Sequence, residues 1–505
     1  MPQINLKKFG AAEPFTAVGL ALIILIIGNR SGVGWSWDST DYVAAGRSLS
    51  HGLGSLDVIG DPMFVRPPGY PALISIGEFF NIKTNTTLLI INLLSAAFMV
   101  FFAHKILQRT TSQITTMMGT LFIVLSPSLL WQFTMAWSEP PFLAIEVVCL
   151  FVALFLKTHW KYPILLLLYI GLFFMRFVGP VFAIPIAFIT VFIDRPNVGW
   201  IKAITYNGLA LLVSFGPTWW WLQRNKDISG TLTGTRTGGG GTLTQAFMNG
   251  LATLGTFFSA QPFDSVVYDK WNMYPIAAQF GLLLVVLTFL ITSIIVLKRL
   301  VQGKNAMSRE VVLVLLMMLG TTGAYLIFSS YRFVYLEYGR LDTRMMVPIL
   351  VPLVIAFAIL IDSTVCKIRS ARFIAIATSA LLIIPQFLVT GRDALSFGHT
   401  GRHMTTAAFI NQPLHIFARS LPDLDGLFSN APQQLSGAVD AWPILNQYQG
   451  ESDRLIPCNH RFVVWYKNFP NQDNIPDIAP ILYDDEQGTI YDLGLCSTDI
   501  NVVWP

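Results

Sequence analysis

Long apolar segments recur along this chain, and they limit its fold more than any other feature of the sequence. A helix needs about 20 largely apolar residues to cross a bilayer. We identify eleven candidate segments for such helices. They cover residues 13–29, 70–80 together with 86–107, 115–132, 140–156, 162–174, 177–193, 203–222, 275–297, 310–330, 345–361 and 373–390. The pattern predicts a polytopic α-helical membrane protein with about eleven transmembrane helices.

The composition agrees with this class of protein. Hydrophobic residues make up 53% of the 505-residue chain and charged residues only 12%, whereas charged residues are about 25% of an average soluble protein. The first apolar segment is followed by "NRSGVGW", which lacks a clean small-x-small cleavage site, so we expect this segment to remain as a membrane anchor. The net charge of +4 is too small to indicate a nucleic-acid partner.

Basic residues are concentrated in alternate connections between the apolar segments. They are Lys7, Lys8, Lys105, Arg109, Lys157, Lys161, Arg195, Lys202, Lys298, Arg299, Lys304, Arg309, Lys367, Arg369 and Arg372. Because such residues favour the cytoplasmic side, the pattern predicts a multi-pass protein of the cell inner (plasma) membrane with a cytoplasmic N-terminus. The other side then receives two long outer loops, 30–69 and 223–274, and the C-terminal region.

The composition changes near residue 400, where short β-like runs alternate with turn residues. We therefore divide the chain into a transmembrane region, 1–395, and a small extracytoplasmic (periplasmic) α/β domain, 396–505. Cys458 and Cys496 both lie in this domain, and in an oxidising compartment they predict a disulfide. Two unpaired buried thiols are the alternative.

Charged side chains gather in the connections that are predicted to be extracytoplasmic. They are Asp38, Asp41, Glu139, Arg176, Arg224, Arg236, Arg340, Asp342 and Arg344. Charged groups near membrane depth are energetically costly and are usually functional. Acids beside several arginines suit a reaction in which the arginines hold a phosphate leaving group while a carboxylate takes a proton from an attacking hydroxyl. The set predicts glycosyl transfer from a lipid-linked sugar phosphate.

Five pieces of sequence, in order and on the predicted sides, carry a family resemblance. They read "DSTDYVAAGRSLSHGLG" followed by "RPPGYPALISIG", then "WSEPPFLA", "FMRFVGPVFAIP", "WWWLQRNKDISGTLTGTR" and "LDTRMMVPILVPL". Over nearly its whole length the chain resembles the GT-C superfamily of polyprenyl-phosphate-sugar-dependent glycosyltransferases. The nearer likeness is to the branch of protein O-mannosyltransferases, aminoarabinose transferases and lipopolysaccharide galacturonosyltransferases. The resemblance implies that 1–395 is a GT-C-like catalytic domain.

The resemblance also implies that Asp38, at the start of the first outer loop, is the catalytic base. Relatives often carry an acidic pair at this place, whereas this chain has Asp38-Ser39. Asp41 is therefore a candidate for a second acid or for a residue that orients a partner. On a juxtamembrane helix over 38–46, both acids and Tyr42 would share one face. The alternative role for Asp38 is to cap that helix.

A further acid, Glu139 in "WSEPPF", opens the predicted segment 140–156. The resemblance implies that it faces the donor phosphate or a metal, and the alternative is a helix N-terminal charge that the helix dipole favours. Two carboxylates would suit a hard divalent cation such as Mg²⁺. No ligand spacing in the sequence is specific, so the metal and cofactor requirement is left open.

Four arginines are candidates for binding the donor phosphate, because the arginine fork of donors suits that group. They are Arg176, Arg344, Arg236 and Arg224. The resemblance supports the first two, with Asp342 holding Arg344 in place, and the alternative for Arg176 is snorkelling to the headgroups. Arg236 lies in "SGTLTGTRTGGGG", which is either a flexible tether or a mobile flap that closes over the phosphate.

These inferences predict an inverting glycosyltransferase that moves a hexose or pentose from a polyprenyl-phosphate donor to a hydroxyl group of a lipid, glycan or protein acceptor. Its partners are then the donor, the acceptor and the bilayer, without nucleic acid. Two alternatives stay open: a glycan polymerase or ligase that uses a pyrophosphate-linked donor, and a membrane transporter. The transporter is disfavoured because the charges gather in outer loops and no repeated half is visible.

Overall fold

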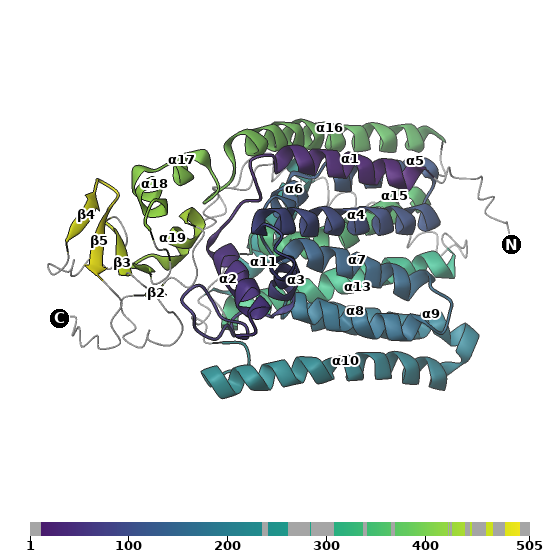
Figure 1. Cartoon of the computed structure of the whole chain (residues 1–505). Coiled ribbons are helices and arrows are strands. Elements are labelled where there is room, and N and C mark those ends of the chain that lie inside the picture. Colours follow the sequence, from purple (N-terminus) through teal and green to yellow (C-terminus); the bar gives the residue numbers. More distant parts are fainter. Residues whose placement is uncertain are drawn as a thin grey trace.

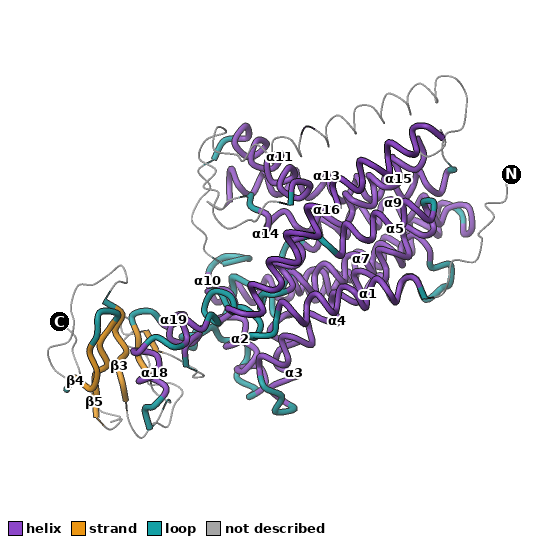
Figure 2. Tube along the Cα trace, turned by 90° about the horizontal axis from the view of Figure 1, so that it is seen from above, coloured by secondary structure: helices purple, strands orange, loops and turns teal. Residues whose placement is uncertain are grey.

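The computed structural model describes residues 12–234, 241–260, 283, 308–336, 341–364, 369–422, 424, 427–439, 445–446, 461–467 and 480–494. Long helices lie side by side in one bundle, and a small β-sheet with short helices lies beyond one end of that bundle (Figure 1). The view from above shows the same two parts, with the strands again set apart from the long helices (Figure 2).

The bundle is built from helices of 12 to 32 residues. Their bounds are α1 (Glu13–Gly28), α4 (Thr84–Thr110), α5 (Gln113–Val124), α7 (Glu139–Phe155), α8 (Lys161–Met175), α9 (Gly179–Val198), α10 (Trp200–Ser229), α13 (Arg309–Tyr331), α15 (Leu350–Thr364) and α16 (Arg369–Thr400). Each of these helices overlaps one of the predicted apolar segments. The predicted segment 275–297 lies outside the described residues.

Five helical segments in the described part of the chain are long and apolar enough to cross a membrane by themselves. They are Thr84–Thr110, Gly179–Val198, Arg309–Tyr335, Thr343–Ser363 and Ser379–Thr400. A bent pair of helices would make a sixth, and Glu13–Gly28 and Lys161–Met175 are apolar but shorter. These helices are those of a multi-pass membrane protein, while the count of eleven spans stays a prediction.

The predicted segment 115–132 is not one continuous helix. It is divided into α5 and α6 (Pro127–Phe133), which meet at an angle of 49°. Pro127 lacks the N–H that a continuous helix needs, and it disfavours a helical Ser126, whose ψ is 118°. The break places α6 directly before the turn that leads into α7 and carries part of the candidate site.

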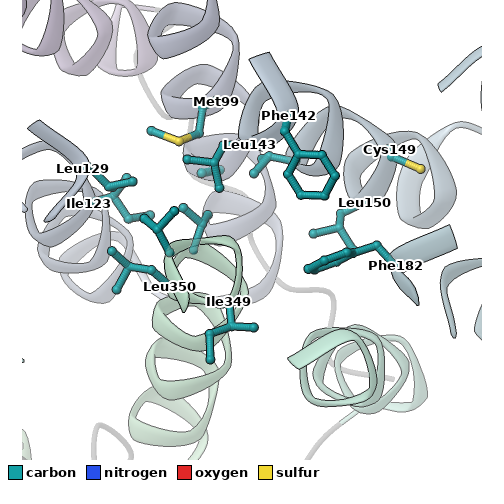
Figure 3. Close-up of a cluster of buried hydrophobic side chains, with 14 of the residues drawn as sticks. Met99, Ile123, Leu129, Phe142, Leu143, Cys149, Leu150, Phe182, Ile349 and Leu350 are labelled. Atoms are coloured by element: carbon teal, nitrogen blue, oxygen red, sulfur yellow. The ribbon is translucent and has the colours of Figure 1, made fainter. Parts of the chain in front are cut away.

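A continuous apolar core joins the helices around α7. Figure 3 shows side chains of α7 among those of its neighbours, including Met99, Ile123, Phe142, Phe182 and Leu350. All five are fully or almost fully buried. Within a bilayer, such contacts hold helices together by close packing, since lipid tails are as apolar as the side chains. The core thereby fixes α7, whose first residue is Glu139.

Three further helices lie at the end of the bundle that faces the sheet (Figure 1). They are α2 (Trp37–Ser50), α3 (Gly69–Phe79) and α11 (Leu243–Ser259). Helices α2 and α3 pack closely, because a Cβ atom on Gly46 would lie only 2.6 Å from Ile74. The helix that carries Asp38 and Asp41 therefore rests on a second short helix.

The predicted outer loop 223–274 is partly helical. Helix α10 continues to Ser229, and α11 occupies residues 243–259. Thr242 caps α11 by accepting a hydrogen bond from the backbone N–H of Gln245, which explains why a helix begins directly after the glycine-rich stretch. Residues 235–240 and 261–274 of the predicted loop lie outside the described residues.

The C-terminal part contains a five-stranded sheet with the order β2-β1-β3-β5-β4. The strands are β1 (Leu427–Ser429), β2 (Leu445–Asn446), β3 (Arg461–Tyr466), β4 (Ile481–Asp484) and β5 (Gly488–Gly494). Strand β1 pairs in parallel with β2 and β3, and β5 pairs antiparallel with β3 and β4. Helices α18 (Pro413–Arg419) and α19 (Pro432–Ala438) contribute side chains to the same apolar core as the sheet.

The predicted division between residues 395 and 396 falls inside α16. That helix continues to Thr400, and the chain then turns at Gly401, whose φ of +74° favours glycine. Helix α16 therefore belongs to the bundle and leads directly into the C-terminal part. Cys458 and Cys496 lie outside the described residues, so their pairing stays a prediction, as does the side of the membrane on which the sheet lies.

Candidate active site

The way α2 begins determines where its acids point. The backbone N–H of Ser36 donates a hydrogen bond to the hydroxyl of Ser39 at 2.9 Å, and the Trp137 indole donates to the Ser36 hydroxyl at 2.7 Å. Ser36 is therefore the N-cap of α2, and Asp38 lies within the first turn. The alternative role of Asp38 as the cap is wrong, and its carboxylate is left for other partners.

Arg66, near the end of the first outer loop, holds both acids of α2. One Nη atom donates to Asp38 Oδ1 at 2.5 Å, and the other donates to Asp41 Oδ2. The guanidinium carbon lies 5.4 Å from the centre of the Tyr42 ring. Arg66 is not among the residues predicted above, although its place before two prolines in "RPPGYP" is a signal of a rigid backbone in an outer loop.

Glu139 begins α7 and is completely buried. Its Oε1 atom accepts hydrogen bonds from Arg176 Nη1 at 2.5 Å and from Arg344 Nε at 2.7 Å. Its Oε2 atom is also buried and has no hydrogen-bond partner among the described residues. Two guanidiniums and the helix N-terminus favour the charged carboxylate, and one oxygen remains as an acceptor for a bound molecule.

Arg344 joins the two acidic segments. Its Nη1 atom lies 2.6 Å from Asp38 Oδ2, while its Nε atom donates to Glu139. The guanidinium carbon lies 4.1 Å from the centre of the Trp137 ring. Asp342 holds this arginine through the backbone, because its carboxylate caps α14 (Thr343–Met346) by accepting from the N–H of Met345 at 2.8 Å.

A continuous series of ion pairs therefore connects the acids. Its order is Asp41, Arg66, Asp38, Arg344, Glu139 and Arg176. These residues come from α2, the loop after it, α14, the start of α7 and the end of α8. Helix ends that are far apart in the sequence meet at the end of the bundle that faces the sheet (Figure 1). The predicted site residues of these segments thus lie in one cluster, which we call the acid–arginine cluster.

A further arginine borders this cluster. Arg332 Nη1 and Arg176 Nη2 lie 3.6 Å and 3.7 Å from the sulfur of Met345. Arg332 begins a short π-helical turn, η2 (Arg332–Leu336), at the end of α13, and such turns are frequent at functional sites. The sequence offers no motif for Arg332, because its place beside Arg176 depends on the packing of α13 against α9 and α15.

Of the two remaining predicted phosphate ligands, Arg224 has its described contacts outside the cluster and Arg236 is not among the described residues. Arg224 donates to the carbonyl of Met63 at 3.4 Å and to Asn225 Oδ1 at 3.2 Å, and it stacks 4.4 Å from the Trp221 ring centre. It therefore attaches the end of α10 to the first outer loop. Arg236 lies outside the described residues, so its role as part of a flap stays a prediction.

The two acids of α2 differ in their ionisation. Burial opposes the charge of Asp38, but the Arg344 and Arg66 guanidiniums outweigh it and hold the pKa of that carboxyl well below its ordinary value. Burial of Asp41 outweighs its single arginine, so its pKa is raised. Asp38 is thus the acid of α2 that stays ionised over the widest pH range. Asp41 is the weaker candidate for the catalytic acid of the two.

A neighbouring acid, Asp57, makes stability depend on pH. Burial and then the Asp41 carboxylate raise the pKa of Asp57 from 3.8 to about 7. The folded protein therefore binds this proton more tightly than the unfolded chain does. Protonation of Asp57 thus adds to the free energy of unfolding in full below about pH 4, and this contribution is lost as the pH rises to about 7. We expect Asp57→Asn to flatten this loss of Tm, measured by differential scanning fluorimetry in detergent. A pH slope like that of the exposed-residue control Asp227→Asn, which should match the wild-type slope, would contradict the assignment.

A metal would have to compete with arginines for the carboxylates of this cluster. Within the described ranges, no group of three or more His, Cys, Asp or Glu side chains is placed to hold a metal ion. Both oxygens of Asp38 accept from guanidiniums, whereas Glu139 Oε2 is buried and has no hydrogen-bond partner among the described residues. A hard cation such as Mg²⁺ would therefore displace an arginine from Asp38, whereas Glu139 Oε2 is available to it without such a displacement.

Comparison with known proteins identifies the fold. No family model and no curated protein matches the sequence. The apo structure of ArnT from Cupriavidus metallidurans aligns over 95% of this chain and 97% of that chain, with a TM-score of 0.60 and 11% sequence identity. The structure of the same protein bound to undecaprenyl phosphate aligns over 96% and 98%, with a TM-score of 0.58 and 11% identity. The predicted resemblance is confirmed at the level of the fold.

Proposed function

We propose that this chain, which has the fold of the GT-C glycosyltransferases, moves a sugar from a polyprenyl-phosphate carrier to an acceptor hydroxyl at the extracytoplasmic face of the inner membrane. The observation that supports the proposal is the acid–arginine cluster at one end of an apolar bundle. A reaction of this kind needs a base, a site for an anionic leaving group and access from the lipid phase. The cluster and the helices around it contain groups suited to each need.

The arginines are the proposed site for the donor phosphate. Arg344 and Arg176 both contact Glu139, and Arg332 lies near Arg176 through Met345. Arginine presents a planar fork of donors, and pairs with phosphate oxygens are short and strong. The polyprenyl chain of the donor would lie along the apolar helices, as the binding of undecaprenyl phosphate by ArnT suggests.

Asp38 is the proposed base. The acceptor oxygen attacks the anomeric carbon of the sugar from the side opposite the phosphate, and its proton passes to Asp38. The bond between that carbon and the phosphate oxygen breaks, the electron pair stays on the phosphate, and the configuration inverts. Arg344 and Arg66 donate to the two oxygens of Asp38 and lower its basicity, so a phosphate that draws one of these arginines away makes Asp38 a stronger base for the proton.

The distribution of charge supports the proposed orientation. The acid–arginine cluster lies at the end of α8, at the start of α7 and before α15. The opposite end of α8 carries Lys161, and two helices packed against α7 and α8 carry basic residues near their C-terminal ends, Arg109 in α4 and Arg195 in α9. Basic residues favour the cytoplasmic side, so the cluster belongs on the other side.

The test of this function uses purified full-length protein and a panel of polyprenyl-phosphate sugars. We expect one donor to raise the Tm of the protein and to be consumed, with release of polyprenyl phosphate. Polyprenyl-pyrophosphate glycans serve as the comparison. Consumption of the pyrophosphate-linked donors alone would assign the protein to the polymerase or ligase class, and turnover of neither kind of donor would contradict glycosyl transfer.

A further inference from the structure

Three separate segments of the chain meet beside the acid–arginine cluster. The N–H of Gly34 donates to the carbonyl of Thr134 at 2.8 Å, and the N–H of Ala136 donates back to the carbonyl of Gly34 at 2.9 Å. On the other side, the N–H of Met404 donates to the carbonyl of Trp35 at 3.1 Å. The segment 33–36 thus lies between 134–136 and 402–404, and we call this arrangement the three-segment junction.

Two of these segments lead directly to the acids. Segment 33–36 ends at Ser36, the N-cap of α2, which carries Asp38. Segment 134–136 continues through Trp137 to Glu139. The hydrogen bond from the Trp137 indole to the Ser36 hydroxyl joins the two again beyond the backbone pairs. The junction thus ties the segment that leads to Asp38 to the segment that leads to Glu139, in addition to the hydrogen bond between the Tyr42 and Ser138 hydroxyls at 3.1 Å.

The third segment follows directly after α16 and contains Arg402, which is 5% exposed. Its Nη1 atom donates to the carbonyl of Trp131 at 3.0 Å and to the hydroxyl of Thr134 at 2.7 Å. The guanidinium carbon lies 3.6 Å from the centre of the Trp131 ring and 4.2 Å from that of Phe397. A buried cation between two rings, with two hydrogen bonds, is a strong anchor.

Gly34 is the place where the three segments come closest together. A Cβ atom there would lie 2.5 Å from Met135 Sδ, 2.8 Å from Arg402 Cβ and 3.2 Å from the carbonyl oxygen of Thr134. The carbonyl oxygen of Thr134 belongs to the backbone, and Arg402 Cβ is the base of a buried side chain. Neither atom can move without separating the segments. Only glycine fits this position.

We propose that Arg402 is a positioning residue that, through the three-segment junction, holds Asp38 and Glu139 at the spacing that Arg344 bridges. The region after α16 then acts on catalysis in addition to any contact with the acceptor. A consequence is that movement of this region, for example on acceptor binding, changes the spacing of the acids. The catalytic part of this inference rests on the proposed function, and the structural part does not.

The structural part is tested by hydrogen exchange on the full-length protein. In Arg402→Gln we expect the Gly34, Ala136 and Met404 amides to exchange faster together, by roughly tenfold or more, while β3 and β5 keep their protection. Arg392→Gln, at a side chain on α16 that is 60% exposed, is the control and should change none of them. Faster exchange confined to Met404, or no change at all, would overturn the proposal whether or not the protein transfers sugar.

The catalytic part is tested with two glycine variants. Gly34→Ala should lower kcat by roughly 10- to 100-fold, because small misplacements of reacting groups are costly. It should also move the acidic limb of the pH–rate profile upward, since Asp38 loses part of its contact with Arg344. Gly19→Ala, in α1 with open space around its Cβ position, should leave both unchanged.

Arg402→Gln should lower kcat in the same way as Gly34→Ala, and Arg402→Lys separates the role of the charge from that of the planar fork. Lysine keeps the charge but cannot stack as a planar group on Trp131 and Phe397, so it should restore only a small part of the rate that Arg402→Gln loses. A variant that lowers the Tm but leaves the acidic limb in place would show a purely structural role and contradict the positioning role. If the wild-type protein transfers no sugar, only the proposed function fails and the exchange result still decides the junction.

Discussion

Asp38→Asn is expected to lower the rate of sugar transfer by roughly 10²- to 10⁴-fold, the usual contribution of a general base. The carboxamide cannot accept the proton of the acceptor hydroxyl. It also competes less for Arg66 and Arg344 than the carboxylate does, so both arginines become more available to the donor phosphate. The variant should therefore bind the donor at least as tightly as the wild-type protein while it turns over far more slowly.

The measurements for Asp38→Asn are single-turnover rate and donor-induced shift of Tm. Asp227→Asn, at an exposed position near the end of α10, is the matched control and should retain the wild-type rate. A folded Asp38→Asn protein that transfers sugar at the wild-type rate would remove Asp38 from the mechanism. Loss of both donor binding and turnover would instead assign Asp38 to the support of the arginines.

Glu139→Gln is expected to destabilise the protein by about 3–5 kcal/mol, the cost of removing one partner from a buried ion pair. Glu139 is completely buried and compensates Arg176, which is 13% exposed, and Arg344, which also pairs with Asp38. Glutamine keeps one acceptor oxygen but leaves the Arg176 charge without a carboxylate. The apparent Tm in detergent should fall, and the donor should partly restore it because its phosphate replaces the missing charge.

The control for Glu139 lies on the same helix. Glu146, seven residues later in α7, is also completely buried, and neither of its carboxylate oxygens has a hydrogen-bond partner among the described residues. Glu146→Gln removes no ion pair, so its Tm should equal or exceed that of the wild-type protein. Equal losses in both variants would mean that the ion pairs of Glu139 contribute nothing to stability.

Local sequence patterns predicted the long helices and the segments that carry the acids. The apolar runs locate α4, α7, α9 and α13, and the sides of these runs place Asp38, Glu139 and Arg344 at one end of the bundle. Such predictions succeed because hydrophobicity and charge act within one segment. Pro127, inside the apolar run, is a sequence signal of the break between α5 and α6. The continuous hydrophobicity of the run nevertheless predicted a single helix.

The partners of the acids were harder to predict. Arg66 lies in the loop that connects α2 to α3, and the packing of these two helices brings it to both carboxylates. Arg332 lies near Arg176 because α13 packs against the helices around α8. Neither relation leaves a spacing in the sequence. Arg402 is similar, because its anchor depends on Trp131 and Thr134, which are more than 260 residues away. Long-range pairs of this kind are decided by tertiary packing alone.

Arg344 is shared between Asp38 and Glu139 within the protein itself, and this sharing bears on how the site empties. Under the proposed reaction the carrier is released as a phosphate monoester, which carries about −1.5 to −2 charges near neutral pH. It therefore binds guanidiniums more tightly than the donor, which is a phosphate diester. Asp38 is an anion of the protein itself and competes with the product phosphate for the same arginines. The ion pairs of the ligand-free site therefore favour release of the carrier, and Asp38 reduces product inhibition in addition to its role as base.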